Sequence, residues 1–163
     1  MIFRAVEDPD LIGRARRGDV EAYNLLISRW EKRVYNYLLR ITGEREEALD
    51  LSQEVFLKAY QHLRKLEDPA RFAPWLFRIA HNEAFSSFRK RKVESDVLAV
   101  TTALTRLTEE QWETLVLKIY QGFKFEEIAE ILSCPVSTVK SRLYAGLDAL
   151  KAQLAPLKTR GVS

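Results

Sequence analysis

Apolar residues recur at helical spacing along almost the whole chain. Alternating runs of β-branched residues bounded by turn residues do not occur, so the pattern predicts an all-α protein without strands. The clearest apolar stripe lies in residues 19–43, where Asp19 is expected to cap a helix that ends at Gly43. Its apolar positions are Tyr23, Leu26, Ile27, Trp30, Val34, Tyr37, Leu38 and Ile41. Such a stripe predicts a helix with one face in a core.

One further helix is predicted before this stripe and one after it. Asp8 followed by Pro9 is typical of an N-cap with proline in the first turn, and Gly18 is expected to end that short helix. A third helix is predicted over residues 44–66. Its buried positions would be Ala48, Leu51, Val55, Ala59 and Leu63. The i,i+4 spacing aligns four polar residues on another face, which we expect to be free for a partner. They are Asp50, Glu54, Lys58 and Gln61.

The rest of the chain predicts a fourth helix and, after it, a second helical unit. Residues 67–69 form a break before a fourth helix at residues 74–92, whose core side would carry Leu76, Ile79 and Ala80. A short polar stretch at residues 93–96 follows, and the next helical unit is expected to open near Leu98. Thr108 and Gln111 have the spacing of a capping box. The chain of 163 residues therefore predicts two small helical domains, residues 1–94 and 95–163, joined by a short linker.

Charge is unevenly distributed along the chain, although the net charge is only +3. Arg89, Lys90, Arg91 and Lys92 form an uninterrupted cationic run, whereas acidic residues concentrate in residues 44–54. This separation predicts one nucleic-acid partner and one protein partner. The single cysteine, Cys134, excludes an internal disulfide and fits a reducing compartment. No apolar run approaches the roughly 18–20 residues that cross a bilayer, so we expect a cytoplasmic protein without membrane insertion.

Residues 125–143 have the pattern of a helix-turn-helix. Ile128, Ala129 and Leu132 are expected to pack against Val139 and Leu143, with Pro135 in the first turn of the second helix. Five polar residues cluster in the first turns of that second helix, where such motifs reach base edges and phosphates. They are Ser137, Thr138, Lys140, Ser141 and Arg142. The alternative is an ordinary solvated helix, but the apolar positions, the proline and the polar cluster in register favour DNA binding.

A second candidate nucleic-acid surface lies in residues 71–92, where aromatic residues interleave with a basic helix end. Cations bind phosphates, and aromatic rings either stack on unpaired bases or belong to the core. Trp75 and Ile79 are expected to lie in the core. Near i,i+4 spacing places four polar residues on one face of this helix. They are Arg78, Asn82, Ser86 and Arg89.

Catalytic chemistry finds little support in the sequence. His62 and His81 lie on different predicted helices without a cysteine or carboxylate cluster at metal-ligand spacing, so each is interpreted as a solitary histidine. Asp50 with Glu54 could form a catalytic or metal pair, but a solvated or partner-binding helix face is commoner. No phosphate-binding glycine loop or nucleophile elbow occurs, and we expect no enzyme activity and no cofactor. A closer alternative is a helix-turn-helix regulator with an N-terminal dimerisation or sensor domain.

Three segments resemble motifs of one known family, in the order in which that family carries them. Residues 50–56 (DLSQEVF) look like its polymerase-binding helix, residues 75–82 (WLFRIAHN) resemble its promoter-melting helix, and residues 138–143 (TVKSRL) are similar to its minus-thirty-five recognition helix. The family is that of the extracytoplasmic-function sigma factors, group four of the sigma-70 family. The resemblance covers nearly the whole chain and implies a sigma factor that directs promoter-specific transcription initiation.

The resemblance also implies partners and roles for individual residues. Asp50, Gln53 and Glu54 would face the beta-prime clamp coiled coil of core RNA polymerase, and the beta flap would be a second contact on the enzyme. The loop at residues 65–71, with Asn82 behind it, would capture a flipped minus-ten base, while Arg78, Arg89 and Arg91 bind phosphates of the same strand. The second helix of the helix-turn-helix would read the minus-thirty-five element. An anti-sigma factor is a further partner that the resemblance suggests.

The chain departs from the family pattern at three places. The family linker is usually longer and threads toward the polymerase active site, a role that the few residues at 93–96 leave unassigned. Ser133 replaces the usual turn glycine, which predicts strain at a left-handed backbone position. Ser87 stands where an aspartate is common. Neither serine removes a side chain on which the predicted sites depend.

Overall fold

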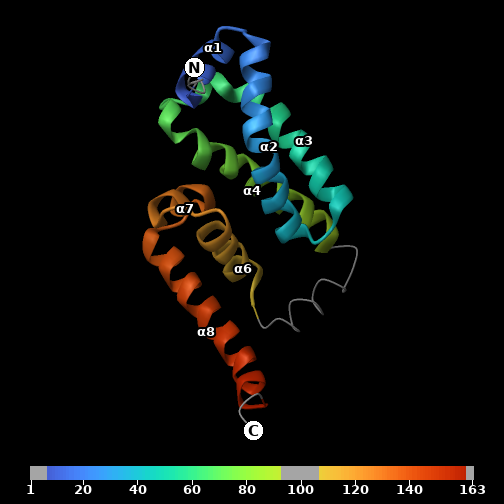
Figure 1. Cartoon of the computed structure of the whole chain (residues 1–163), viewed down its shortest axis with the longest axis vertical. Coiled ribbons are helices and arrows are strands. Elements are labelled where there is room, and N and C mark those ends of the chain that lie inside the picture. The colour runs from blue at the N-terminus through green and yellow to red at the C-terminus, as the bar shows by residue number, and fades with distance from the viewer. Residues whose placement is uncertain (1–6, 93–106, 161–163) are drawn as a thin grey trace, which may run out of the picture. The chain divides into compact units, whose positions relative to one another are not determined.

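The computed structural model describes residues 7–92 and 107–160, with side chains over residues 7–86 and 107–152. Every regular element in these ranges is helical, which confirms the all-α prediction (Figure 1). The chain divides into two compact units, Met1–Ala84 and Phe85–Ser163. The predicted helix near Leu98 and the predicted domain boundary between residues 94 and 95 lie outside the described residues.

The first unit contains three helices and the greater part of a fourth. They are α1 (Asp8–Arg16), α2 (Val20–Thr42), α3 (Arg45–His62) and α4 (Phe72–Lys92), with 3₁₀ turns η1 (Leu63–Lys65) and η2 (Pro69–Arg71) before α4. Helices α2 and α3 lie side by side, and α1 packs on α2 (Figure 1). The predicted third helix ran to residue 66, whereas α3 ends at His62 and the chain tightens into η1. The fourth helix begins at Phe72, two residues before its predicted start.

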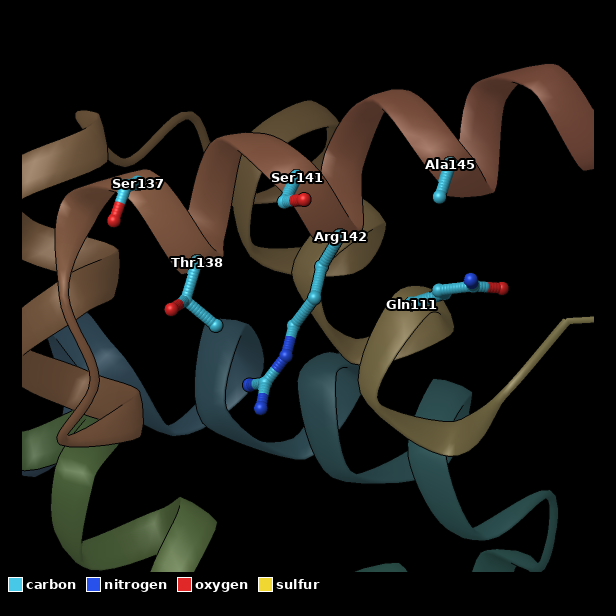
Figure 2. Close-up of a pocket in the computed structure, with 6 residues that line it drawn as sticks. All are labelled: Gln111, Ser137, Thr138, Ser141, Arg142 and Ala145. Carbon is cyan, nitrogen blue, oxygen red and sulfur yellow. The ribbon is translucent and has the colours of Figure 1, made fainter.

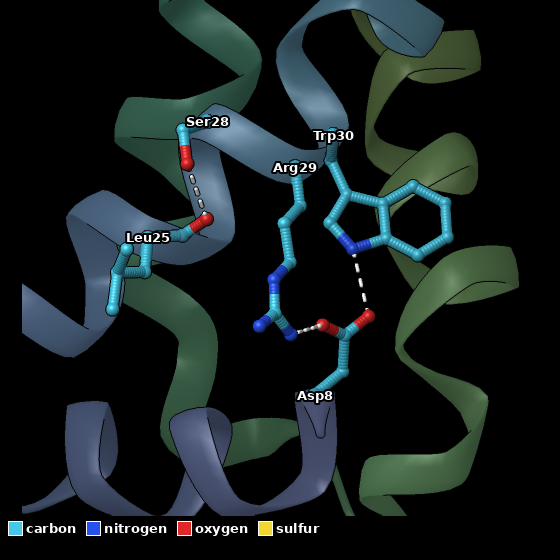
Figure 3. Close-up of polar contacts among 5 residues, drawn as sticks. All are labelled: Asp8, Leu25, Ser28, Arg29 and Trp30. Carbon is cyan, nitrogen blue, oxygen red and sulfur yellow. Dashed lines mark hydrogen bonds and ion pairs between the residues drawn. The ribbon is translucent and has the colours of Figure 1, made fainter. Parts of the chain in front are cut away.

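The start of α1 differs from the prediction. Glu7, and not Asp8, is the N-cap residue, although Pro9 lies in the first turn as expected. Asp8 is the first residue of α1, and its carboxylate does not cap that helix. The carboxylate instead faces α2. There it accepts hydrogen bonds from Arg29 Nη1 and from Trp30 Nε1, each 2.9 Å long (Figure 3). The residue predicted to cap a helix therefore joins two helices.

Helix α2 follows the sequence pattern closely. The Asp19 carboxylate accepts a hydrogen bond from the Ala22 amide at 3.2 Å, which confirms the predicted cap. Gly43 has φ 72°, and its amide donates to the Leu39 carbonyl at 2.8 Å, so the helix ends in the left-handed conformation that glycine favours. Of the predicted stripe, Tyr23, Leu26, Val34, Tyr37 and Leu38 are buried, and Ile27, Trp30 and Ile41 are half-buried.

The core of the first unit joins α2 to α3 and α4. All five residues predicted to be buried in the third helix are buried. The Tyr23 hydroxyl donates a hydrogen bond to the Phe56 carbonyl of α3, and burial raises the pKa of this phenol above its ordinary range. The Tyr37 ring meets the Phe77 ring of α4 edge-on at 5.2 Å. Leu76 and Ala80 are buried as predicted, and Ile79 is half-buried.

The second unit contains α6 (Glu109–Leu115), the π-helical turn η3 (Val116–Tyr120), α7 (Phe125–Leu132) and α8 (Val136–Arg160). The predicted capping box is confirmed, because Thr108 Oγ1 accepts from the Gln111 amide and Gln111 Oε1 accepts from the Thr108 amide, both at 3.1 Å. Leu107, Leu115 and Leu143 form a buried cluster. A Cβ atom at Gly146 would lie 3.1 Å from Leu115 Cδ1, so α6 and α8 cross closely there.

The predicted helix-turn-helix is formed by α7 and α8. Ser133, between the helices, has φ 52° and ψ 49°, the left-handed conformation expected at this position. Pro135 lies one residue before α8 instead of in its first turn, and its carbonyl accepts hydrogen bonds from the amides of Thr138 and Val139. Ile128, Val139 and Leu143 are buried as predicted. Ala129 and Leu132 are only half-buried, and Ile131, which lies between them in the sequence and was not predicted, is buried.

Candidate functional site

Helix α3 presents an exposed face that combines acids with leucines. The side chains of Asp50, Gln53 and Glu54 are all exposed, as a partner-binding surface requires. Beside them Leu49 and Leu57 are 53% and 52% exposed, so two apolar side chains flank the acids on this face. These two leucines were not predicted from the sequence. Their signal was their position four residues on either side of Gln53, away from the buried stripe.

Lys58 belongs to the structure of the first unit and not to this exposed face. Its ammonium forms an ion pair with the Glu83 carboxylate of α4, and this hydrogen bond raises the pKa of the lysine. The prediction that the whole polar face of the third helix is free was therefore wrong at Lys58. Asp50, Glu54 and Gln61 remain exposed. The acidic-apolar face is defined here as Leu49, Asp50, Gln53, Glu54 and Leu57.

The second candidate surface lies on α4 and on the segment that precedes it. Asp68 caps η2 by accepting a hydrogen bond from the Ala70 amide at 3.0 Å. Phe72 anchors the other end of this segment, because its buried ring meets Trp30 at 5.9 Å and Trp75 at 5.9 Å. Trp75 and Ile79, predicted for the core, are half-buried. The segment is therefore held by packing at its helical end.

Helix α4 exposes part of the predicted polar face. Arg78, Asn82 and Ser86 are exposed at four-residue intervals, which places them together on one side of the helix. Arg89 and Arg91 lie in α4, but their side chains are outside the described residues. The structure thus aligns an amide and a guanidinium beyond the η2 segment, an arrangement able to bind a nucleobase edge and a phosphate.

The candidate recognition surface of the second unit is built on the first three turns of α8. Ser137, Lys140 and Ser141 are exposed, and Thr138 and Arg142 are half-buried. Figure 2 shows Ser137, Thr138, Ser141 and Arg142 on α8 and Gln111 on α6, and these residues line one shallow depression. Four of the five predicted residues therefore share one recess, and the fifth, Lys140, lies beside the Phe125 ring with Nζ 5.5 Å from its centroid.

Two residues of this surface were not predicted from the sequence. Gln111 lines the depression, and since its oxygen accepts from the Thr108 amide, its NH₂ group is the part available to a ligand. Tyr144 follows Ser141 by one turn and is 56% exposed. An exposed aromatic ring on a recognition helix can contact a thymine methyl group. Arg142 Nη1 also lies 4.0 Å from Cys134 Sγ, so the turn and α8 touch.

Among the described residues, no group of three or more histidine, cysteine or acidic side chains is placed to hold a metal ion. His62 is exposed and His81 is half-buried, on α3 and α4 respectively. In the same described ranges, no helix is long and apolar enough to span a membrane.

Comparison with known proteins finds two family models in chain order. The model of sigma-70 region 2 matches residues 26–94, and that of sigma-70 region 4 matches residues 98–150, so together they cover more than half of the chain. The chain is similar to the RNA polymerase sigma-H factor of Pseudomonas aeruginosa, with 29% identity covering 93% of this chain and 95% of the relative. It is also similar to the ECF RNA polymerase sigma-E factor of Escherichia coli K12, with 28% identity covering 94% and 97%.

Solved structures show the same fold. CnrH, solved in complex with the cytosolic domain of CnrY, matches with a TM-score of 0.75 and 27% identity, covering 90% of this chain and 96% of that one. The sigma factor RpoE of Bartonella quintana, solved with the anti-sigma factor NepR, matches with a TM-score of 0.70 and 24% identity. That match covers 81% of this chain and 96% of the RpoE chain.

Proposed function

The chain belongs to the extracytoplasmic-function group of the sigma-70 family, and from this premise we propose how its surfaces divide the work of transcription initiation. A sigma factor of this family binds core RNA polymerase and directs it to promoters. We assign core binding, minus-ten recognition and melting to residues 1–94, and minus-thirty-five recognition to residues 95–163. The observation that carries this division is the presence of an exposed acidic-apolar face in one unit and a helix-turn-helix in the other.

The acidic-apolar face of α3 is assigned to the beta-prime clamp of the polymerase. Asp50, Gln53 and Glu54 would pair with polar and basic groups of the clamp coiled coil, and Leu49 and Leu57 would supply apolar area. Apolar burial contributes about 25 cal/mol per Å², so two half-exposed leucines add binding energy that the acids alone lack. The charges would instead set orientation and association rate. The beta flap is assigned to the second unit.

Promoter opening is assigned to α4 and the segment at residues 65–71. Asn82 carries donors and an acceptor that can pair with the edge of a flipped minus-ten base, and unstacking that base costs a few kcal/mol that the pocket must offset. Arg78, Arg89 and Arg91 would bind phosphates of the same strand. The exposed positions of Arg78 and Asn82 on one side of α4 support this assignment.

Minus-thirty-five recognition is assigned to the N-terminal turns of α8 in the major groove. Ser137, Thr138, Ser141 and Arg142 surround one recess and would contact bases and phosphates, and Lys140 would contact the backbone. The NH₂ group of Gln111 would be a further donor in the same recess. Alanine at the base-reading positions should relax preference at single base pairs, whereas loss of a phosphate contact should weaken all sequences alike.

The family consists of DNA-binding transcription factors, and we propose that this chain has no catalytic activity of its own and requires no cofactor. We place it in the cytoplasm, where polymerase and chromosome are found. An anti-sigma factor is proposed as a regulatory partner, because CnrH was solved with the cytosolic domain of CnrY bound and the Bartonella RpoE with an anti-sigma factor bound. Such an inhibitor would compete for the polymerase-binding and DNA-binding surfaces.

Reconstitution with core RNA polymerase tests the function directly. The purified chain is expected to bind core enzyme and to permit initiation from its own promoter without another sigma factor. A helix-turn-helix regulator with a dimerisation or sensor domain would instead bind duplex DNA alone and leave core enzyme inactive. Absence of core binding by the folded chain would overturn the proposal.

A further inference from the structure

Two lysine ammonium groups lie against one aromatic ring in the second unit. Lys118 Nζ is 4.4 Å and Lys140 Nζ is 5.5 Å from the centroid of Phe125. The lysines come from different elements, since Lys118 lies in η3 and Lys140 in α8, while Phe125 is the first residue of α7. The ring of α7 thus contacts one cation from η3 and one from α8.

The ring itself is fixed by the core. Phe125 is half-buried and packs against the cluster of Leu107, Leu115 and Leu143. A ring held in this way presents a fixed electrostatic face, and the negative charge density of that face attracts both ammonium groups. Lys118 also donates a hydrogen bond to the Phe123 carbonyl at 3.2 Å, which directs its side chain back toward α7.

Neither lysine is neutralised by a carboxylate in the part of the chain whose side chains are described. Ion pairs in that part of the chain include Arg14 with Asp19, Arg29 with Asp8, and Lys58 with Glu83, and neither lysine takes part in them. The Glu127 carboxylate of α7 accepts a hydrogen bond from the Lys124 amide at 2.9 Å. Two like charges beside one ring repel each other, and a bound anion would remove that repulsion.

The two cations are close enough to each other to bind one nucleic-acid strand together. Because both lie near one centroid, their nitrogens are at most about 10 Å apart, and phosphates on one strand of B-DNA recur every ~3.4 Å along the helix axis. Lys140 stands on the exposed side of α8, next to the recess at its N-terminal turns. The proximity of Lys118 to Lys140 thus places a second cation near the helix that would enter the duplex.

We propose that Lys118 and Lys140 form one phosphate-binding site for the DNA backbone, and that Phe125 is the residue that positions both ammonium groups. The site rests on the proposed function, because it requires that α8 enter duplex DNA. It extends the DNA contact beyond the helix-turn-helix to η3. It also assigns Lys118 a role besides its bond to the Phe123 carbonyl.

The test measures how the affinity of the full-length chain for DNA depends on salt. The probes are a short duplex selected by this chain from a randomised pool and an unselected duplex of equal length. Lys118→Gln is expected to make the slope of log K against log salt shallower by about 0.9, and to weaken both duplexes by the same factor. Lys140→Gln should do the same. Lys151→Gln, which removes an exposed lysine farther along α8, is the matched control and should leave the slope unchanged.

The Phe125 variants test whether the ring positions the two ammonium groups, because these variants leave the charge of the chain unchanged. Phe125→Leu keeps both lysines, so it should weaken binding a few-fold at nearly unchanged slope, whereas Phe125→Tyr should bind like the native chain. In NMR spectra of the free protein, the ring should shift the Hε resonances of both lysines upfield in the native chain and in Phe125→Tyr, but not in Phe125→Leu. If the ring were needed only for stability, a folded Phe125→Leu variant would lose the upfield shift but would still bind DNA like the native chain.

The outcomes separate this site from the function on which it rests. If Lys140→Gln makes the slope shallower but Lys118→Gln does not, the shared site is wrong while the assignment of α8 stands; this result does not depend on whether Phe125 variants fold. If Lys140→Gln, Arg142→Ala and Lys118→Gln all leave binding intact, α8 is not the DNA-reading helix, and both proposals are overturned.

Discussion

The indole nitrogen of Trp30 on α2 donates a hydrogen bond of 2.9 Å to the carboxylate of Asp8 on α1 (Figure 3). The same carboxylate accepts from Arg29 Nη1, so one acid in the first turn of α1 satisfies two donors of the neighbouring helix. The Trp30 ring in turn meets Phe72 edge-on at the start of α4. Asp8 therefore stabilises the packing that holds the segment before α4.

Replacing Asp8 by alanine is expected to destabilise the first unit by about 1–3 kcal/mol, because a partly buried indole N–H and a guanidinium lose their acceptor. Urea unfolding followed by tryptophan fluorescence measures this change. Asp10→Ala removes another acid from the same first turn, one that is exposed, and should cost much less. Equal losses for the two variants would show that the effect comes from the helix dipole and not from the contact with α2.

Replacing both Asp50 and Glu54 by lysine is expected to weaken binding to core RNA polymerase without unfolding the chain, since exposed charges contribute little to stability. Fluorescence anisotropy of labelled chain titrated with core enzyme measures the affinity. The charge-matched control is Glu21→Lys with Glu31→Lys, two exposed acids of α2. A folded double variant that binds core enzyme like the native chain would remove the acidic residues of α3 from the polymerase contact.

Leu49→Ser with Leu57→Ser tests the apolar part of the same face. Because both leucines are about half exposed in the free chain, their loss should leave the free energy of unfolding almost unchanged. It should nevertheless increase the dissociation rate from core enzyme, since apolar contacts act mainly after encounter. The dissociation rate is measured with core enzyme bound to a surface, after the supply of the sigma variant has been stopped. An unaltered rate would show that the clamp contacts the acids only.

Replacing Asn82 by alanine is expected to impair formation of the open promoter complex more than initial promoter binding. Capture of a base is useful only once that base is unpaired, so a pre-melted bubble should restore part of the lost activity. Permanganate footprinting on duplex and bubble templates measures both effects. Arg78→Ala should weaken single-strand binding in a salt-dependent manner that a bubble does not rescue. Normal duplex opening by the Asn82 variant would exclude this residue from melting.

The Asp19 cap predicts a defined pH dependence of stability. The hydrogen bond from the Ala22 amide, aided by Arg14, lowers the pKa of Asp19 below its ordinary value of 3.8. A carboxylate with a lowered pKa in the folded state contributes stability at pH values above the unfolded pKa, and this contribution is lost as pH falls through the folded pKa. In the Asp19→Asn variant the side-chain amide would still cap the helix but would not titrate. The stability difference between the native chain and this variant should therefore shrink below about pH 4, measured by thermal unfolding.

Ser133→Gly is expected to stabilise the second unit. Ser133 has φ 52°, a conformation that costs a residue with a Cβ atom about 1–2 kcal/mol relative to the right-handed helix. Glycine adopts it freely but loses more backbone entropy on folding, so a net gain of roughly 0.5–1 kcal/mol is expected. Calorimetric unfolding of the full chain measures it. Loss of stability would show that the serine side chain compensates for the strain through its own contacts.

The periodicity of apolar residues and the capping residues predicted the helices of the first unit and the helix-turn-helix, but only some of the helix ends. The stripe of α2, the Asp19 cap, the Gly43 terminus and the Thr108–Gln111 capping box were all predicted and confirmed. These features depend on hydrogen bonds between residues three or four apart and on burial of one helix face, so the local sequence contains the information. The same local spacing placed Ser137, Thr138, Ser141 and Arg142 around one recess of α8.

Only the tertiary structure decided which side chains meet across elements. Asp8 joins α2 instead of capping its own helix, and Lys58 pairs with Glu83, 25 residues away. Leu49 and Leu57 are exposed because the buried stripe of α3 already fills the core, and Phe125 meets Lys118 and Lys140 only once η3, α7 and α8 are folded together. Such contacts depend on the relative placement of helices, which packing determines and which no spacing along a single helix contains.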